Sequence, residues 1–248
     1  MQECLVALGG NLQISGKVIK DAIAELQCRG CSDVRMSRVL KTRPVGAAAA
    51  NEFLNAAAVL RTEHQPAELL KTLHEIEALF HRVRTLHWGP RTLDLDLILY
   101  GESEANTPGL VVPHPAMWYR RFVIEPAVEV AAQMIHPVLN ESVAQLYARL
   151  MCRPLRLEIC STQYTAESVV LHQTLKQVND FGDATEWYPT NPESCIAPHS
   201  FARIIVRHGT RPTTLQPFNR KGREIEVVGE SVSDIVSQLE DLKTAMLG

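Results

Sequence analysis

Two aspartates near the middle of the chain have the spacing of a metal site. Asp94 and Asp96 lie in the run TLDLDLILYG, where acidic residues alternate with leucines. Alternate side chains of a strand share one face, so we expect both carboxylates on one face and Leu93, Leu95 and Leu97 on the core face. Mg²⁺ usually takes one or two protein carboxylates and completes its shell with water and phosphate oxygens. The pattern indicates a magnesium site, although a solvent-exposed strand face can carry the same pair.

A cationic cluster immediately precedes these aspartates. Residues 81–92 contain Arg82, Arg84 and Arg91 and no acid. Guanidinium groups bind phosphate oxygens bidentately and stay charged at any relevant pH. Cations beside a divalent-metal site are what transfer of a phosphate-containing group requires. Ion pairs with the aspartates would also explain these charges, but not the rigid segment 88–90, Trp-Gly-Pro, that leads into the strand.

Short elements in the first half of the chain must position these residues. Alternation and helical spacing predict strands over residues 3–8, 34–42, 53–62 and 92–100 and a helix over 65–80. A further helix is expected between an N-cap at Ser15 and a stop at Gly30, and the first strand is expected to end at Gly9-Gly10. The resulting βαββαβ order predicts an α+β sandwich in which helices cover one side of a sheet.

The second half of the chain continues this pattern and then restarts. Apolar periodicity extends over residues 122–132, and a helix is expected over 141–150. Beyond residue 153 we expect strands over 155–160, 201–206 and 224–228, helices over 166–178 and 232–246, and a loop over 182–198. We therefore predict two domains, residues 1–153 and a smaller α/β module over residues 154–248.

Composition excludes several classes of protein. The 25 Lys and Arg against 28 Asp and Glu give a net charge of −3, so nucleic acid is an improbable partner. No segment reaches the roughly 18 apolar residues of a membrane span, and no signal-peptide pattern opens the chain, which predicts a cytoplasmic protein without a membrane partner. Cys28 and Cys31 form one CxxC, which fits half a zinc site, a redox pair or two free thiols.

Three segments together resemble the 6-hydroxymethyl-7,8-dihydropterin pyrophosphokinase family of folate biosynthesis. They are TRPVGAAAANEFLNA (42–56), RVRTLHWGPRTLDLDLILYG (82–101) and VPHPAMWYRRFVIEP (112–126). The resemblance covers about residues 1–150 and implies a ferredoxin-like α+β fold. It also implies transfer of the terminal diphosphate of ATP to the pterin hydroxymethyl group, with release of AMP. The absence of a Walker A motif fits this family, which binds ATP without a P-loop.

The resemblance assigns roles to individual residues. Asp94 and Asp96 would hold two Mg²⁺ ions, and Arg82 and Arg91 would clamp the phosphates of ATP. The pterin pocket would be formed by Thr42, Val45, Phe53, Asn55 and Phe122. Contacts with ATP and its loops would come from His74, Glu77, Arg84, Trp88, His114 and Arg120. Without the family context, the two phenylalanines would be core residues and His114 a structural histidine.

Several positions depart from the family's pattern. His81 replaces a small residue, Arg43 stands where proline is frequent, and His74 stands where glutamine is commoner. Gly109 and Val111 occupy positions where some members have an arginine and a hydroxyl near ATP. These departures bear on nucleotide affinity and loop motion and leave the aspartate pair intact.

The C-terminal module carries one local motif. Residues 207–212, RHGTRP, are similar to the catalytic start of histidine phosphatases, but no second histidine follows His208. Residues 203–223 contain six Lys or Arg and no acid, which fits an anion-binding segment or ion pairing with neighbouring acids. We expect an interaction or dimerisation module here. The opposing hypothesis for the whole chain is a non-catalytic sensor or scaffold that keeps both ligand sites.

Overall fold

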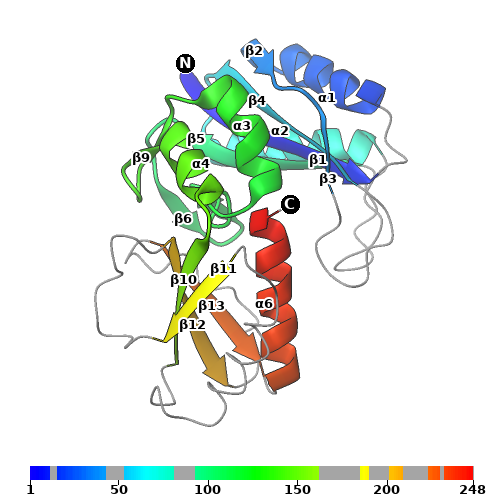
Figure 1. The fold of residues 1–248 in the computed structure, drawn as a ribbon. Coiled ribbons are helices and arrows are strands. Elements are labelled where there is room, and N and C mark those ends of the chain that lie inside the picture. The colour runs from blue at the N-terminus through cyan, green and yellow to red at the C-terminus, as the bar shows by residue number, and fades with distance from the viewer. Residues whose placement is uncertain are drawn as a thin grey trace. The chain divides into compact units, whose positions relative to one another are not determined.

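A computed structural model describes residues 1–11, 16–42, 53–80, 93–161, 185–189, 201–208, 223–229 and 232–247. The described residues form a mixed α/β structure (Figure 1). The chain divides into two compact units, Met1–Tyr147 with Ala245–Gly248, and Ala148–Thr244. The boundary between functional domains near residue 153 remains a prediction.

The first unit is built on an antiparallel sheet in the order β2-β4-β1-β5, with β3 paired to β4. The strands are β1 (Gln2–Asn11), β2 (Ser32–Met36), β3 (Leu40–Thr42), β4 (Phe53–Thr62) and β5 (Asp94–Tyr100). β1 does not end at Gly9-Gly10 as the sequence predicted, because β4 pairs with it as far as Asn11. The central strand β1 therefore extends alongside the predicted site residues of β4 and β5.

Helices cover this sheet on both faces. On one face, α1 (Gly16–Cys28) and α2 (Pro66–Leu79) contribute Ile19, Leu26, Leu69 and Leu73 to a core with the even-numbered residues of β1 and β4. On the other face, α3 (Arg121–Ala131) packs against β4, which buries Ala57 and Val59 there. The predicted N-cap Ser15 lies outside the described residues. The face that α3 covers in part is the one on which the side chains of the odd-numbered residues of β4 lie.

The strand predicted over residues 34–42 is two short strands. Its pairing with β4 shifts between Ser32 and Arg35, and the chain leaves the ladder at residues 37–39. At this break Ser37 Oγ accepts a hydrogen bond from Ala57 N at 2.9 Å. Arg38 bonds Glu129 of α3 through both its backbone N and its guanidinium. These side-chain hydrogen bonds supplement the backbone bond from Ser37 N to the carbonyl oxygen of Ala57, at 2.9 Å, and an alternating sequence pattern does not reveal them.

Two short hairpins lie in the first unit after β5, and α4 extends past Tyr147, where the N-terminal segment of that unit ends. The sequence did not predict these hairpins, and α4 follows them. The hairpins are β6 (Ala105–Thr107) with β7 (Leu110–Val112), and β8 (Ile135–His136) with β9 (Glu141–Ser142). Gly109, at φ 87°, lies in the tight turn of the first hairpin, a conformation that glycine adopts without strain. The expected helix over 141–150 is α4, Val143–Met151.

The second unit contains a parallel sheet in the order β11-β10-β12-β13, followed by α6 (Val232–Leu247). The strands are β10 (Leu155–Ser161), β11 (Thr185–Pro189), β12 (Ala202–His208) and β13 (Glu224–Gly229). The prediction of a loop over 182–198 was wrong at β11, because pairing with β10 satisfies the backbone of a segment whose prolines and polar residues read as loop. The helix predicted over 166–178 lies outside the described residues.

Three charged residues form a buried row across this parallel sheet. The register places Glu158 of β10 beside Arg203 of β12, and Arg203 beside Glu224 of β13. Arg203 Nη2 lies 2.7 Å from Glu158 Oε2, and Arg203 Nη1 lies 3.6 Å from Glu224 Oε1. At most 6% of any of the three side chains is exposed. The single guanidinium therefore compensates part of the negative charge of the two carboxylates inside the unit.

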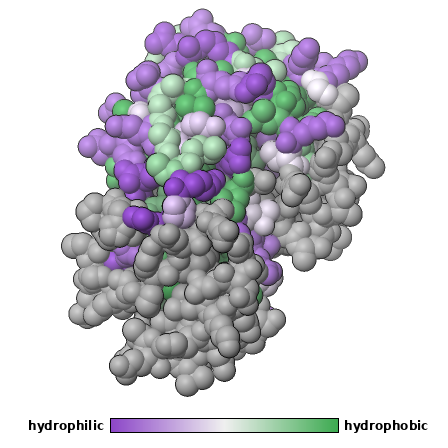
Figure 2. Space-filling model, viewed as in Figure 1, coloured by the Kyte–Doolittle hydropathy of each residue, from purple (hydrophilic) through white to green (hydrophobic). Residues whose placement is uncertain are grey.

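The surface of the described residues is mostly hydrophilic. Figure 2 shows polar residues over much of the described surface of the first unit, with smaller hydrophobic areas between them. Among the described residues, the large exposed hydrophobic side chains are Met1, Leu79 and Met151. None of the helices in the described ranges is long and apolar enough to cross a membrane.

Candidate active site

The two aspartates lie on one face of β5, as predicted. Asp94 and Asp96 are half-buried, and the leucines at 95 and 97 between and after them are buried in the core. Register with β1 places Asp94 beside Gly9 and Asp96 beside Ala7. Two carboxylates that share a face and are spaced by one residue fit a Mg²⁺ ion that keeps water and phosphate oxygens as its other ligands. No group of three or more potential metal-binding side chains occurs among the described residues, so phosphate and water would have to supply the rest.

Glu77 supports the strand that carries the aspartates. It lies on α2 with only 1% of its surface exposed, and its Oε1 accepts a hydrogen bond from Leu95 N at 2.8 Å. That amide lies directly between Asp94 and Asp96 in the sequence. A buried carboxylate bonded to a backbone N–H fixes the position of the strand. The predicted contact of Glu77 with ATP remains a prediction, as does that of His74, which is exposed on α2.

Asn55 faces the aspartates from the other side of β1. Asn55 is 8% exposed, and its Nδ2 donates a hydrogen bond to Thr42 Oγ1 of β3 at 2.7 Å. Register places Asn55 opposite Gly9, whose other neighbour is Asp94. Directly paired residues share a face, so Asn55 and Asp94 point the same way with a glycine between them. Phe53 is two residues before Asn55 and pairs with Thr42, which places three predicted pterin-binding residues together.

The N-terminal end of α3 brings three more predicted residues to this region. Arg120 precedes α3, and its Cζ lies 5.8 Å from the ring centroid of Phe122. His114 is tied to β5, because its backbone N donates to the carbonyl oxygen of Ile98 at 2.9 Å. Its Nδ1 accepts a hydrogen bond from Ala116 N at 3.2 Å.

Electrostatics show that His114, Arg120 and Asp94 are neighbours. The pKa of His114 is lowered to about 4, first by burial and then by the positive charge of Arg120, while a backbone hydrogen bond and the charge of Asp94 act in the opposite direction. His114 is therefore neutral near pH 7, with Nδ1 as an acceptor and Nε2 left to donate. The structure thus gathers this predicted ATP contact beside the predicted metal ligand Asp94.

Five of the predicted site residues lie outside the described residues. They are Val45, Arg82, Arg84, Trp88 and Arg91. Arg43 and His81, two of the departures from the family pattern, lie outside them as well. The remaining candidates come from β3, β4, β5, α2 and the start of α3, except His114, which lies between β7 and α3.

Sequence reasoning missed two features near this site. Gly9 was taken as the end of a strand, although it lies within β1 between Asn55 and Asp94. The bond between Arg38 and Glu129, which joins the chain just before β3 to α3, had no signal because the partners are 91 residues apart. The sequence carried one signal for the position of Gly9: it is a glycine inside a strand, where glycine weakens the sheet.

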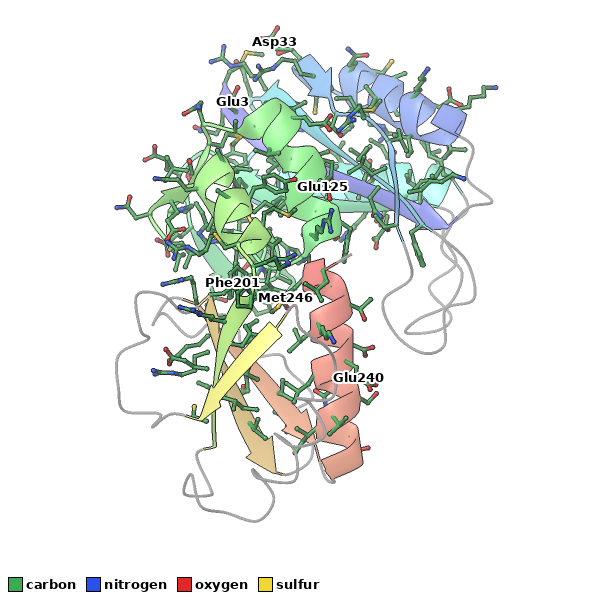
Figure 3. The ribbon with its side chains drawn as sticks, viewed as in Figure 1. Glu3, Asp33, Glu125, Phe201, Glu240 and Met246 are labelled. Atoms are coloured by element: carbon green, nitrogen blue, oxygen red, sulfur yellow. The ribbon has the colours of Figure 1, made fainter. Side chains whose placement is uncertain are left out.

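A surface hollow of about 560 Å³ lies elsewhere on the first unit. It is lined by Glu3, Gln27, Asp33, Val34, Arg35 and Arg61. Figure 3 labels Glu3 and Asp33 at this end of the sheet. Glu3 lies six residues from Gly9 along β1, and the hollow contains none of the predicted site residues.

Cys28 and Cys31 differ in their surroundings. Cys28 is exposed and Cys31 is buried, and burial raises the pKa of the Cys31 thiol. No metal-binding group forms around them among the residues that the structure describes. The described residues therefore give no support to a zinc site at this CxxC.

Comparison with known proteins gives the first unit a family. The sequence matches the family described as 7,8-dihydro-6-hydroxymethylpterin-pyrophosphokinase (HPPK) over residues 5–132. Two curated relatives carry the name 2-amino-4-hydroxy-6-hydroxymethyldihydropteridine pyrophosphokinase. The one from Synechocystis sp. is 39% identical over 61% of this chain and 79% of its own length. The one from Haemophilus influenzae is 36% identical over 56% of this chain and 90% of its own length.

A solved structure of Plasmodium falciparum HPPK-DHPS aligns with 84% of this chain and 57% of its own, at 11% identity and a TM-score of 0.48. That similarity adds nothing to the assignment. The family match ends at residue 132 and does not reach the second unit. Because the match covers more than half of the chain and contains both aspartates and Asn55, the chain belongs to the 7,8-dihydro-6-hydroxymethylpterin-pyrophosphokinase family.

Proposed function

We propose that the chain transfers the terminal diphosphate of ATP to the hydroxymethyl group of 6-hydroxymethyl-7,8-dihydropterin in folate biosynthesis. The observation that carries this proposal is the common face of the sheet on which Asn55 and Asp94 lie, separated by one strand, in a chain of this family. An amide that can match a heterocycle and carboxylates that can hold metal-bound phosphates are what the two substrates need. The strand and helix order supports a ferredoxin-like core as the scaffold.

The pterin pocket in this proposal is formed around Asn55. Its carboxamide is fixed by Thr42, so it presents a defined donor and acceptor pattern to a flat heterocycle. Phe53 and Phe122 would stack on the two faces of the ring, with Val45 completing the wall. In this proposal the hydroxymethyl group would point toward β5 and its aspartates.

The phosphate site is formed on β5 and by the preceding arginines. Asp94 and Asp96 would hold Mg²⁺, which when bound neutralises charge on the phosphate oxygens of ATP. Arg82 and Arg91 would clamp the diphosphate being transferred, and Arg84, Trp88, His74, Glu77, His114 and Arg120 would complete the nucleotide contacts. Neutral His114 can donate a hydrogen bond from Nε2 without adding charge.

The reaction requires no covalent nucleophile on the protein. The hydroxymethyl oxygen forms a bond to the β-phosphorus and gives its proton to water, the bond from that phosphorus to the oxygen bridging it to the α-phosphorus breaks, and AMP leaves. The chain contributes in-line positioning and charge stabilisation, which account for most catalysis in phosphoryl-type transfer. The buried Glu77 and the half-buried Thr42 would hold the two halves of the site in place.

The test is AMP release by the full chain from ATP, Mg²⁺ and 6-hydroxymethyl-7,8-dihydropterin. We expect AMP and the pterin diphosphate in equal amounts, and no AMP when the pterin or the metal is omitted. Binding of both ligands without any pterin-dependent AMP would instead support the sensor or scaffold hypothesis. The proposed role of the second unit in interaction or dimerisation is separate, and sedimentation of the full chain tests it.

A further inference from the structure

The backbone conformation at position 9 does not require a glycine. Gly9 lies inside β1, paired on both sides, where glycine weakens a strand because it has no side chain to pack. The glycines of the described residues with φ in the left-handed region are Gly30, Gly101 and Gly109, and Gly9 is not among them. An alanine could therefore adopt the backbone of Gly9, and the reason for glycine has to be space.

The space above Gly9 is limited by Asn55. A Cβ atom at position 9 would lie 3.1 Å from Asn55 Oδ1, closer than ordinary van der Waals contact. Asn55 has little freedom to withdraw, since it is 8% exposed and its Nδ2 is bonded to Thr42 at 2.7 Å. A methyl group at position 9 would turn the carboxamide and stretch that hydrogen bond.

The same space lies between the two halves of the proposed site. Adjacent strands are about 4.8 Å apart, so the backbones at Asn55 and Asp94 are separated by about 10 Å across Gly9. All three positions share one face of the sheet. A substrate held by Asn55 has to reach Asp94 over the glycine, because no side chain stands between them in this row.

We propose that Gly9 is a positioning and size-selecting residue for the pterin, which keeps the Asn55 carboxamide in place and leaves room for the 6-hydroxymethyl group to reach the aspartates. This inference rests on the proposed function. Gly9, which has no side chain, would then control both the affinity for the pterin and the length of the 6-substituent that fits. ATP, which is bound by other elements, is not controlled by Gly9.

The test compares Gly9→Ala with Gly16→Ala in the full chain. Gly16 is the matched control, because a Cβ there meets nothing within 4 Å. Calorimetry with 6-hydroxymethyl-7,8-dihydropterin, Mg²⁺ and a non-hydrolysable ATP analogue should show about tenfold weaker pterin binding for Gly9→Ala, as expected when a buried hydrogen bond is strained. Gly16→Ala should match wild type, and the affinity for the ATP analogue should be unchanged in both variants.

A double-variant cycle separates positioning from a general structural effect. In an Asn55→Ala background, Gly9→Ala should cause less than a twofold further loss, because the side chain that it displaces is absent. An equal loss in both backgrounds, or wild-type affinity for Gly9→Ala, would overturn the inference. Failure of the wild-type chain to bind the pterin would overturn the proposed function instead.

A measurement on the wild-type chain covers the case in which Gly9→Ala does not fold. A pterin with one methyl group added to its hydroxymethyl carbon should bind about tenfold more weakly than the natural substituent, since overpacking a fitted space is unfavourable. Equal affinity for the two compounds would show that the space over Gly9 does not select the substituent.

Discussion

Each of the two larger sheets carries a row of facing residues across three adjacent strands, and the rows differ at the middle position. They are Asn55–Gly9–Asp94 in the first unit and Glu158–Arg203–Glu224 in the second. Arg203 fills the middle of its row and lies 2.7 Å from one acid and 3.6 Å from the other. Gly9 leaves the ends of its row separated. The residue in the middle of the row therefore decides whether the side chains at its ends are joined through it or are separated by a space that a ligand can enter.

Replacing the central cation should have the largest effect on stability. Arg203→Met removes the cation that lies between Glu158 and Glu224 in the buried row, and breaking such a buried pair costs about 3–5 kcal/mol. Hydrogen exchange of the full chain should show lost protection in β10 and β12 while β4 keeps its protection. The double variant Arg203→Met with Glu158→Leu should regain part of the loss, and no regain would contradict the compensation assigned to this row.

Removing a carboxylate from the candidate active site should lower turnover and leave the fold unchanged. Asp96→Asn is expected to lower kcat about a hundredfold, because one anionic ligand for the phosphate-bound metal is lost. Asp33→Asn, at the exposed position on β2 beside the surface hollow, is the matched control. Pterin binding should survive in both variants, and unchanged turnover in Asp96→Asn would rule out the metal assignment.

A lower pH should destabilise the first unit through its neutral, buried His136, whereas the buried row of the second unit is already charged. Burial lowers the pKa of His136 to about 4, and its Nδ1 accepts a hydrogen bond from Leu139 N. The unfolded chain binds this proton near pH 6.5 and the folded chain only near pH 4, so stability falls as pH decreases across that window. The loss is on the order of 2–3 kcal/mol for this histidine. Urea unfolding at pH 7 and pH 4.5 checks it, with His136→Gln expected to reduce the difference while His114, whose pKa is also lowered to about 4, keeps its share.

Loss of the strand anchor should give the smallest change. Glu77→Ala removes the acceptor of Leu95 N and is expected to lower the free energy of unfolding by about 1–2 kcal/mol. Exchange of the Leu95 amide should accelerate in particular. Glu75→Ala, which alters an exposed acid on the same helix, should stay within about 0.5 kcal/mol of wild type. Equal effects of the two changes would refute an anchoring role for Glu77.

Local pattern predicted the parts of the site that lie within one strand. The shared face of Asp94 and Asp96 follows from alternation alone, and the structure has it. The neighbours Asn55 and Thr42 depend on the pairing of β3 with β4, which only the resemblance implied. Gly9 suggested a strand end because glycine often marks one, whereas pairing with strands on both sides carries β1 past it.

The same limit explains the errors in the rest of the fold. The break at residues 37–39 is stabilised by Ser37 and by the bond from Arg38 to Glu129, contacts that no local window contains. The strand β11 forms because β10 offers it a partner in parallel register. Both depend on residues far apart in the chain, so composition and periodicity could not reveal them.

The hydrogen bond from Leu95 N to Glu77 has a consequence for association between molecules. β5 is the last strand in the order of the first sheet, and an edge strand with unpaired amides can recruit a strand from another chain. Glu77 occupies the amide in the middle of the aspartate segment and adds a carboxylate at that edge. A strand from another chain would therefore find the amide between Asp94 and Asp96 already bonded, which makes strand addition at this part of the edge unfavourable.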